Sequence, residues 1–285
     1  MTLTLVRHHP RPTSPTPSVD ARARARDWAE IQERMLVPLY EAVYERLEVG
    51  EPTRLLGVGC GSGLALLLAA RRGARVTGVD AESPELLALA RRRLGAGGDA
   101  RARDGVRVLD GADVAAAGGA PYSLVSAFHP VGCVSGDRER LTADLAATLP
   151  LARRGSPVVL TSWGPPERCA TSSVLHTVMR LAAPRCDDGD RGAWRPAERD
   201  ELEAVCTLAG LRPDGSGRVA CPFGYAGVDS AVRGLLSTGL LDGAVAATDA
   251  ERVRKELEEA LHPYVRGDGT VWMPNVFRYL ISRTV

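Results

Sequence analysis

Gly57-Val58-Gly59-Cys60-Gly61-Ser62-Gly63 is the most informative segment of the sequence. An apolar run with the composition of a buried strand, residues 54–58, precedes it, and an apolar segment typical of a helix, residues 64–72, follows it. Glycine lets the backbone turn tightly and approach a ligand without a Cβ in the way, and the first turn of a helix offers free N–H groups. The segment therefore predicts a ligand-binding turn between a strand and a helix.

A carboxylate at the end of the next predicted strand, residues 75–79, completes this pattern. Asp80 lies twenty-one residues after Gly59, a spacing at which an acidic residue commonly holds the hydroxyls of a ribose. The glycines follow the spacing GxGxG, and Leu64 stands where the dinucleotide pattern GxGxxG would have its third glycine. The pattern indicates a nucleoside cofactor and disfavours nicotinamide dinucleotides and nucleoside triphosphates.

Strands and helices alternate on both sides of this segment, which is typical of a parallel sheet with helices on its two faces. An amphipathic helix is expected before it, from about Asp27 to Leu47. Further strands are expected at residues 106–109, 122–128, 157–163 and 276–281. The predicted fold class is α/β, a doubly wound Rossmann-like sheet with an N-terminal helical cap.

The chain is expected to contain one domain after a short tail. Residues 1–19 are rich in Pro, Ser and Thr and cannot build a core, so they predict a flexible tail. Within the domain, residues 20–285, we expect a helical cap over 20–50, a cofactor-binding core over 51–163, and a substrate lid with the final strands over 164–285. Thr248 and Glu251 have the spacing of a capping box and predict the start of a late helix.

Composition and charge narrow the range of partners. The net charge is +1 and the 36 basic residues are scattered, so the sequence predicts no nucleic-acid surface. It contains no secretory signal pattern and no run of about 18 apolar residues, which predicts a cytoplasmic protein without membrane association. The six cysteines lack metal-site spacing, so we expect reduced thiols and no metal. A small-molecule substrate is expected, with a monomer or a homodimer as the assembly.

These residues resemble the class I S-adenosylmethionine-dependent methyltransferase superfamily, especially small actinobacterial natural-product methyltransferases. The resemblance is nearly full length, from residues 27–32 and 38–40, through the glycine segment, to residues 163–169 and 275–280. It implies a seven-stranded sheet whose last strand is antiparallel. It also implies S-adenosyl-L-methionine as cofactor, S-adenosyl-L-homocysteine as product, and methyl transfer to an O, N or C nucleophile of a small, specialised metabolite.

The resemblance further implies roles for individual residues. Gly59, Gly61 and Gly63 would lie under the methionine portion of the cofactor. Asp80 would hold the ribose, and Ala81 would lie against the adenine. Asp110 would accept from the adenine amino group, or Asp113 would do so if the loop is shifted. The other cofactor-binding positions would be Gly57, Cys60, Gly111 and Phe128, and the substrate positions would be Trp28, Tyr40, His129 and Trp163.

Two departures from the family pattern bear on function. The family usually has an acidic residue at the position of Gly57, where its carboxylate contacts the cofactor ammonium directly or through water. Loss of a charge-assisted hydrogen bond costs about 1.5–3 kcal/mol, so affinity would fall roughly ten- to a hundred-fold unless another group substitutes. An extra residue also lies between Asp80 and Ser83. Two alternatives stay open: a non-methylating reaction such as cyclisation, and a non-catalytic binding or accessory role.

His129 is the candidate general base, because an imidazole titrates near neutrality and this one follows a strand at the expected ligand-binding edge. A passive contact with the substrate, or the capping of a strand, is the alternative. Trp163 either walls the substrate pocket or belongs to the core.

Overall fold

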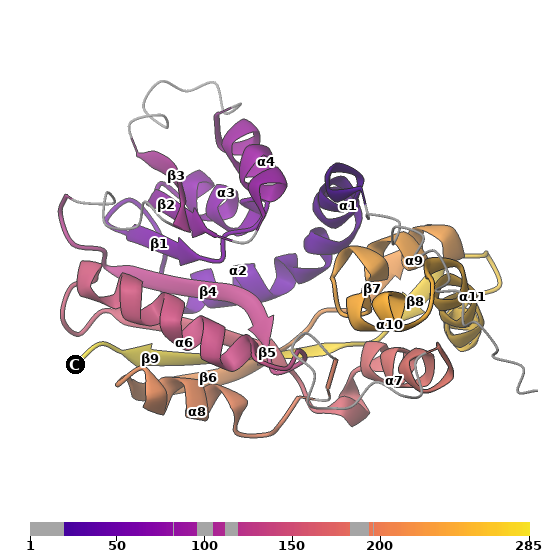
Figure 1. The fold of residues 1–285 in the computed structure, drawn as a ribbon. Coiled ribbons are helices and arrows are strands. Elements are labelled where there is room, and N and C mark those ends of the chain that lie inside the picture. The colour runs from indigo at the N-terminus through magenta and orange to yellow at the C-terminus, as the bar shows by residue number, and fades with distance from the viewer. Residues whose placement is uncertain (1–19, 82, 96–104, 112–118, 183–193, 196) are drawn as a thin grey trace, which may run out of the picture.

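The computed structural model describes residues 20–81, 83–95, 105–111, 119–182, 194–195 and 197–285. A seven-stranded sheet in the order β3-β2-β1-β4-β5-β9-β6 forms its centre (Figure 1). Strands β1 to β5 pair in parallel, and β9 pairs antiparallel with both β5 and β6. The strands are β1 Arg54–Val58, β2 Arg75–Asp80, β3 Val106–Asp110, β4 Leu124–Val131, β5 Pro157–Trp163, β6 Arg212–Ala220 and β9 Val276–Arg283. The predicted Rossmann-like sheet with an antiparallel last strand is confirmed.

Helices cover both faces of this sheet (Figure 1). One face carries α2 Val37–Arg46, α3 Leu64–Arg71 and α4 Pro84–Gly95, and the other carries α6 Asp137–Thr148 and α8 Glu201–Leu208. Successive side chains of a strand point to opposite faces, so Leu55 joins the core beneath α2 and α3 while Leu56 joins the core beneath α6 and α8. Because β1 is buried on both faces, its sequence is a continuous apolar run.

The N-terminal cap is an irregular helix. It consists of α1 Ala21–Asp27, a π-helical turn Trp28–Gln32, a 3₁₀ turn Glu33–Leu36 and α2. The Asp20 carboxylate begins it by accepting from the backbone N–H of Arg22 at 3.0 Å, as an N-cap residue does. Tyr44, buried in α2, donates its hydroxyl hydrogen to the Ala65 carbonyl at 2.9 Å and so ties the cap to α3. The predicted tail, residues 1–19, lies outside the described residues.

The longest insertion lies between β6 and β9, within the range 164–285 where we expect the substrate lid and the final strands. It contains β7 Phe223–Tyr225, α9 Val228–Ser237, α10 Asp242–Ala247, α11 Ala250–Leu261 and β8 Val271–Met273. The segment that follows β5, where the expected lid range begins, contributes α7 Ala170–Ala182, which packs on α11 beyond the end of the sheet (Figure 1). Helix α9 contacts α1, and the Tyr225 hydroxyl donates to Oε1 of Gln32 at 2.8 Å. The insertion and the cap therefore hold each other in place.

The start of α11 corrects one local prediction. Asp249, not Thr248, is the N-cap residue, because its carboxylate accepts from the Arg252 N–H at 2.7 Å. The Thr248 hydroxyl instead donates to the Ala244 carbonyl of α10 at 2.8 Å. An N-cap needs extended backbone dihedrals, which Asp249 has and Thr248, at the end of α10, does not.

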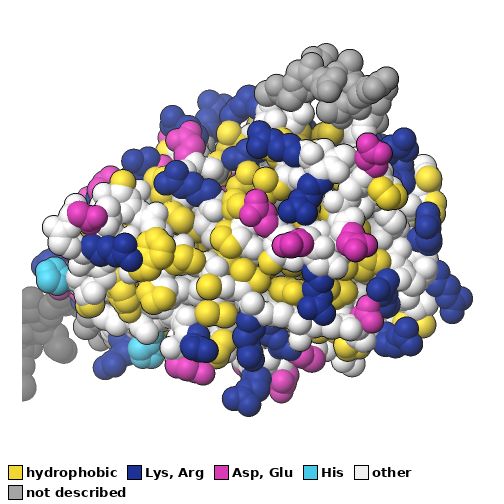
Figure 2. Space-filling model, turned by 180° about the vertical axis from the view of Figure 1, so that it is seen from behind, with side chains coloured by type: hydrophobic (Ala, Val, Ile, Leu, Met, Phe, Trp, Pro, Cys, Tyr) yellow, Lys and Arg dark blue, Asp and Glu magenta, His cyan; other side chains and the backbone are white. Residues whose placement is uncertain are grey.

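Opposite charges are mixed on the molecular surface. Figure 2 shows basic and acidic side chains interspersed over the face seen from behind. In the part of the chain that the structure describes, no helix has both the length and the apolar composition needed to cross a bilayer.

Candidate functional site

The glycine segment forms a tight turn between β1 and α3. Gly59, Gly61 and Gly63 have φ angles of +60°, +52° and +80°, which residues with a Cβ rarely adopt. Gly63 immediately precedes α3, and a Cβ on it would lie 3.0 Å from the Cβ of Ala90 in α4. Glycine is therefore required for the backbone angles and, at Gly63, also for the packing of α3 against α4.

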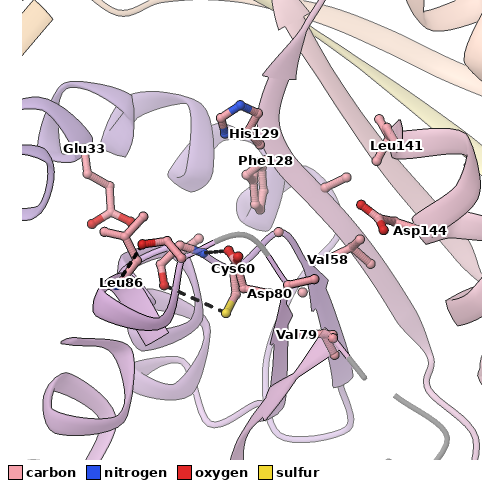
Figure 3. Close-up of a pocket in the computed structure, with 18 of the residues that line it drawn as sticks. Glu33, Val58, Cys60, Val79, Asp80, Leu86, Phe128, His129, Leu141 and Asp144 are labelled. Carbon is pink, nitrogen blue, oxygen red and sulfur yellow. Dashed lines mark hydrogen bonds between the residues drawn. The ribbon is translucent and has the colours of Figure 1, made fainter. Parts of the chain in front are cut away.

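Asp80 is the last residue of β2 and is bonded to this turn. Its Oδ2 accepts a hydrogen bond from the Gly61 N–H at 2.9 Å, and the Cys60 N–H donates to the Val79 carbonyl at 3.1 Å. Figure 3 shows the Asp80 carboxylate beside the turn that carries Cys60. The carboxylate thus fixes the position of the glycine turn at the carboxyl end of the sheet, the edge where α/β folds bind their ligands.

Cys60 is not an activated nucleophile. Burial, followed by the charge of Asp80, raises the pKa of its thiol to about 12. The thiol is therefore protonated at neutral pH, whereas a nucleophilic cysteine needs a lowered pKa.

A cavity of about 640 Å³ opens over the glycine turn, within the usual size range of small-molecule sites, about 300–1,000 Å³. It lies between the carboxyl ends of β1, β2 and β4, the N-terminal cap, α6 and the end of α9. The predicted residues that line it are Gly57, Gly59, Cys60, Gly61, Asp80, Ala81, Gly111, Phe128, Trp28, Tyr40 and His129. Lining residues that the sequence did not indicate include Glu33, Arg140, Leu141, Asp144, Ser237 and Thr238.

Three predicted site residues lie outside the lining of this cavity. Gly63 lies beneath the turn against Ala90, as described above. Asp110 ends β3 opposite Asp80 in the strand register, and only its neighbour Gly111 reaches the cavity. Trp163 is 8% exposed and packs on Phe223 and Phe277, with ring centroids 5.9 and 4.6 Å away, so the structure places it in the core. Asp113 lies outside the described residues.

Gly57 is covered by a leucine side chain. It lies opposite Gly78 in the β1–β2 register, and the Leu66 side chain of α3 covers both glycines. A Cβ on Gly57 would lie 2.8 Å from Cδ2 of Leu66, and a Cβ on Gly78 would lie 2.4 Å from Cδ1 of the same residue. The space beside the main chain of Gly57 is therefore filled by apolar packing.

Aromatic side chains form one wall of the cavity. Tyr40 and Phe128 meet edge to face, with ring centroids 4.8 Å apart, and Tyr44 contacts Phe128 from the side at 5.5 Å. Burial raises the pKa of Tyr40 well above its usual value, so the hydroxyl stays a neutral hydrogen-bond donor. His129 follows Phe128 in β4 and is solvent-exposed where the cavity opens (Figure 3).

A buried carboxylate from the cap lies on the other side of the glycine turn. Oε2 of Glu33 accepts from the Ser62 hydroxyl and from Nη1 of Arg93, the latter at 2.7 Å. Arg93 also donates to the Ser62 carbonyl at 3.0 Å, which links the cap, the turn and α4. Burial raises the pKa of Glu33, and the bonds from Ser62 and Arg93 oppose that rise. No periodic signal in the sequence marked this residue as buried.

Comparisons with known proteins agree on the fold. Residues 56–117 match a family model described as a methyltransferase domain. The structure is similar to an S-adenosylmethionine-dependent methyltransferase from Thiobacillus denitrificans solved with S-adenosyl-L-homocysteine, at 19% identity and a TM-score of 0.51, covering 93% of this chain and 99% of that one. It is also similar to the protein YcgJ from Bacillus subtilis, at 16% identity and a TM-score of 0.52, covering 86% of this chain and 98% of that one. No curated protein matches the sequence.

Proposed function

We propose that this chain, which carries a class I methyltransferase domain, transfers the methyl group of S-adenosyl-L-methionine to an O, N or C nucleophile of a small, specialised metabolite. The observation that carries the proposal is the bond between Asp80 and the Gly61 N–H. It joins a carboxylate at the end of β2 to a turn that requires glycine, and both line a cavity of ligand size.

The donor set fits the cofactor. Gly59 and Gly61 let the main chain approach the ligand, and Asp80 supplies acceptors for the ribose hydroxyls. Ala81 and Gly111 both line the cavity, and a Cβ on Gly111 would lie 2.3 Å from the Cβ of Ala81, so glycine is required for these two residues to pack directly on each other at this edge of the sheet. When bound, S-adenosyl-L-methionine supplies a methyl group activated by a sulfonium.

The protein's own task is then alignment and proton removal, since a displacement at an activated methyl mainly needs the nucleophile in line. Tyr40 and Phe128 supply an aromatic wall, and we assign His129, which lines the same cavity, to accept a proton from the incoming nucleophile.

The direct test incubates the protein with S-adenosyl-L-methionine carrying an isotopically labelled methyl group and a panel of small phenols, amines and activated carbon acids. Label in an organic product supports methyl transfer. Conversion of an acceptor without incorporation of label would instead favour the non-methylating alternative that the glycine at position 57 suggests.

Replacing Asp80 with alanine should raise the Kd for S-adenosyl-L-homocysteine about 30-fold, as expected from losing about 2 kcal/mol of charge-assisted hydrogen bonding. Isothermal titration calorimetry measures the change. Asp80→Asn is the matched control, because its amide oxygen can still accept from the Gly61 N–H while the charge is gone. Equal affinities of wild type and Asp80→Ala would show that the ribose is held elsewhere.

Replacing His129 with glutamine should lower kcat on an acceptor found by the labelling screen by about 100-fold, the low end for a general base. The Kd for S-adenosyl-L-homocysteine should stay within about twofold, because His129 lies on the acceptor side. An unchanged kcat would assign His129 to passive contact with the substrate.

A further inference from the structure

Two side chains of the N-terminal cap meet the glycine turn at one point. A Cβ built on Gly61 would lie 3.8 Å from Nε1 of Trp28 and 3.9 Å from Oε1 of Glu33. Both residues line the cavity, and Figure 3 shows Glu33 on the side of the turn that faces the cap. An indole donor and a carboxylate acceptor therefore both lie close to the same point beside Gly61.

The π-helical turn brings these two residues onto one face of the cap. The Glu33 N–H bonds to the Trp28 carbonyl five residues earlier. In a regular α-helix, residues five apart point about 140° away from each other, because each residue turns the helix by about 100°. The wider π turn removes most of this offset, and such turns are frequent at functional sites.

Trp28 and Glu33 together offer the hydrogen-bonding groups that bind an α-amino acid, a donor for its carboxylate and an acceptor for its ammonium. Nε1 of Trp28 is fully buried and has no hydrogen-bond acceptor among the described residues, although a buried donor normally has one. Ser62, Arg93 and the Leu64 amide occupy three of about four acceptor positions of the Glu33 carboxylate. One acceptor position of Glu33 and the indole donor of Trp28 therefore remain for a ligand, and an ammonium and a carboxylate on the same carbon would satisfy both.

We propose that Glu33 binds the ammonium and Trp28 Nε1 the carboxylate of the methionine portion of S-adenosyl-L-methionine, so that the cap replaces the acidic residue usual at position 57. This inference rests on the proposed function. It also accounts for Gly57, because Leu66 fills the space where that acidic side chain would begin. In this arrangement the negative group comes from the N-terminal cap and not from β1.

The test compares three ligands by isothermal titration calorimetry. S-adenosyl-L-homocysteine carries both the ammonium and the carboxylate of the methionine portion. Decarboxylated S-adenosylmethionine carries the ammonium without the carboxylate, and 5′-methylthioadenosine carries neither of the two groups. Glu33→Gln should raise the Kd for S-adenosyl-L-homocysteine and for decarboxylated S-adenosylmethionine at least tenfold. The Kd for 5′-methylthioadenosine should stay within twofold of the wild-type value. Trp28→Phe should raise the Kd for S-adenosyl-L-homocysteine by about fivefold and leave the Kd values of the other two ligands unchanged. Glu41→Gln, an exposed acidic residue of the same cap, should change none of the three affinities.

Each other result would overturn the inference. If Glu33→Gln weakened all three ligands equally, Glu33 would only support the glycine turn through Ser62. If S-adenosyl-L-homocysteine bound Glu33→Gln as tightly as wild type, the ammonium would be held elsewhere. If the wild-type protein bound neither S-adenosyl-L-homocysteine nor 5′-methylthioadenosine, the proposed function would fail, and the inference with it. Binding of 5′-methylthioadenosine by the variants is also the check that they are folded.

Discussion

Gly63→Ala should lower the free energy of unfolding by about 2–5 kcal/mol. A residue with a Cβ in the left-handed region costs about 1–2 kcal/mol, and Gly63 has a φ angle of +80°. The added Cβ would also lie 3.0 and 3.2 Å from Cβ and Cα of Ala90, and such overpacking costs about 1–3 kcal/mol. Urea unfolding monitored by circular dichroism measures the change.

Gly155→Ala is the matched control for this prediction. Gly155 has nearly the same φ angle, +77°, but a Cβ on it would meet no atom within 4 Å. We expect a loss of about 1–2 kcal/mol there, from the backbone angle alone. The difference between the two variants measures the contact of α3 with α4. Equal losses of unfolding free energy in the two variants would mean that α3 and α4 accommodate the added Cβ without an energetic cost. The loss would then come from the φ angle alone.

Gly57→Asp should destabilise the protein by about 3–5 kcal/mol, as buried charges without a partner do, and should not tighten binding of S-adenosyl-L-homocysteine. Gly57 is buried in β1, and the new Cβ would lie 2.8 Å from a leucine side chain that is itself only 2% exposed. We therefore expect that an acidic residue at position 57 does not regain the contact with the cofactor ammonium that it makes in the family. Urea unfolding and calorimetry on the same sample report both effects.

The double variant Gly57→Asp with Leu66→Ala tests the cause. If Leu66 is the obstacle, removing its side chain makes room, and the double variant should be more stable than the sum of the two single losses predicts. Tighter binding by Gly57→Asp alone, with an unchanged unfolding midpoint, would contradict this account. It would show that the family position remains accessible and that glycine merely leaves it unused.

The sequence predicted the glycine turn and the sheet well because both depend on local rules. Positive φ angles at Gly59, Gly61 and Gly63 follow from the residue type, and the buried strands are short apolar runs. Asp80 was recognised by its position at the end of a strand. The small sheet of β7 and β8 was missed, because three-residue strands carry too little pattern to distinguish them from loops.

The cap side of the site could not be predicted, because its helix is not regular. The spacing of Trp28, Ile31 and Met35 indicated one apolar face of an α-helix, which would leave Glu33 on the polar face. The π turn rotates the residues after Trp28, so Glu33 is buried at 3% exposure beside Ser62.

The position of Trp163 could not be predicted from the sequence either. An aromatic residue at the end of a strand is equally compatible with a pocket wall and with the core, and in the structure Trp163 belongs to the core.

The place of β9 in the sheet determines when the sheet can be completed. Val276–Arg283 lies between β5 and β6, whose residues were synthesised much earlier. Until the ribosome has added β9, β5 and β6 each present an unpaired edge, and such edges invite aggregation. The neighbours β1 to β4, which carry the glycine turn and Asp80, pair without it. During synthesis the part of the sheet made by β1 to β4 can therefore form first, while β5 and β6 wait for β9, and the pairing of β5 with β9 spans more than a hundred residues and so forms slowly.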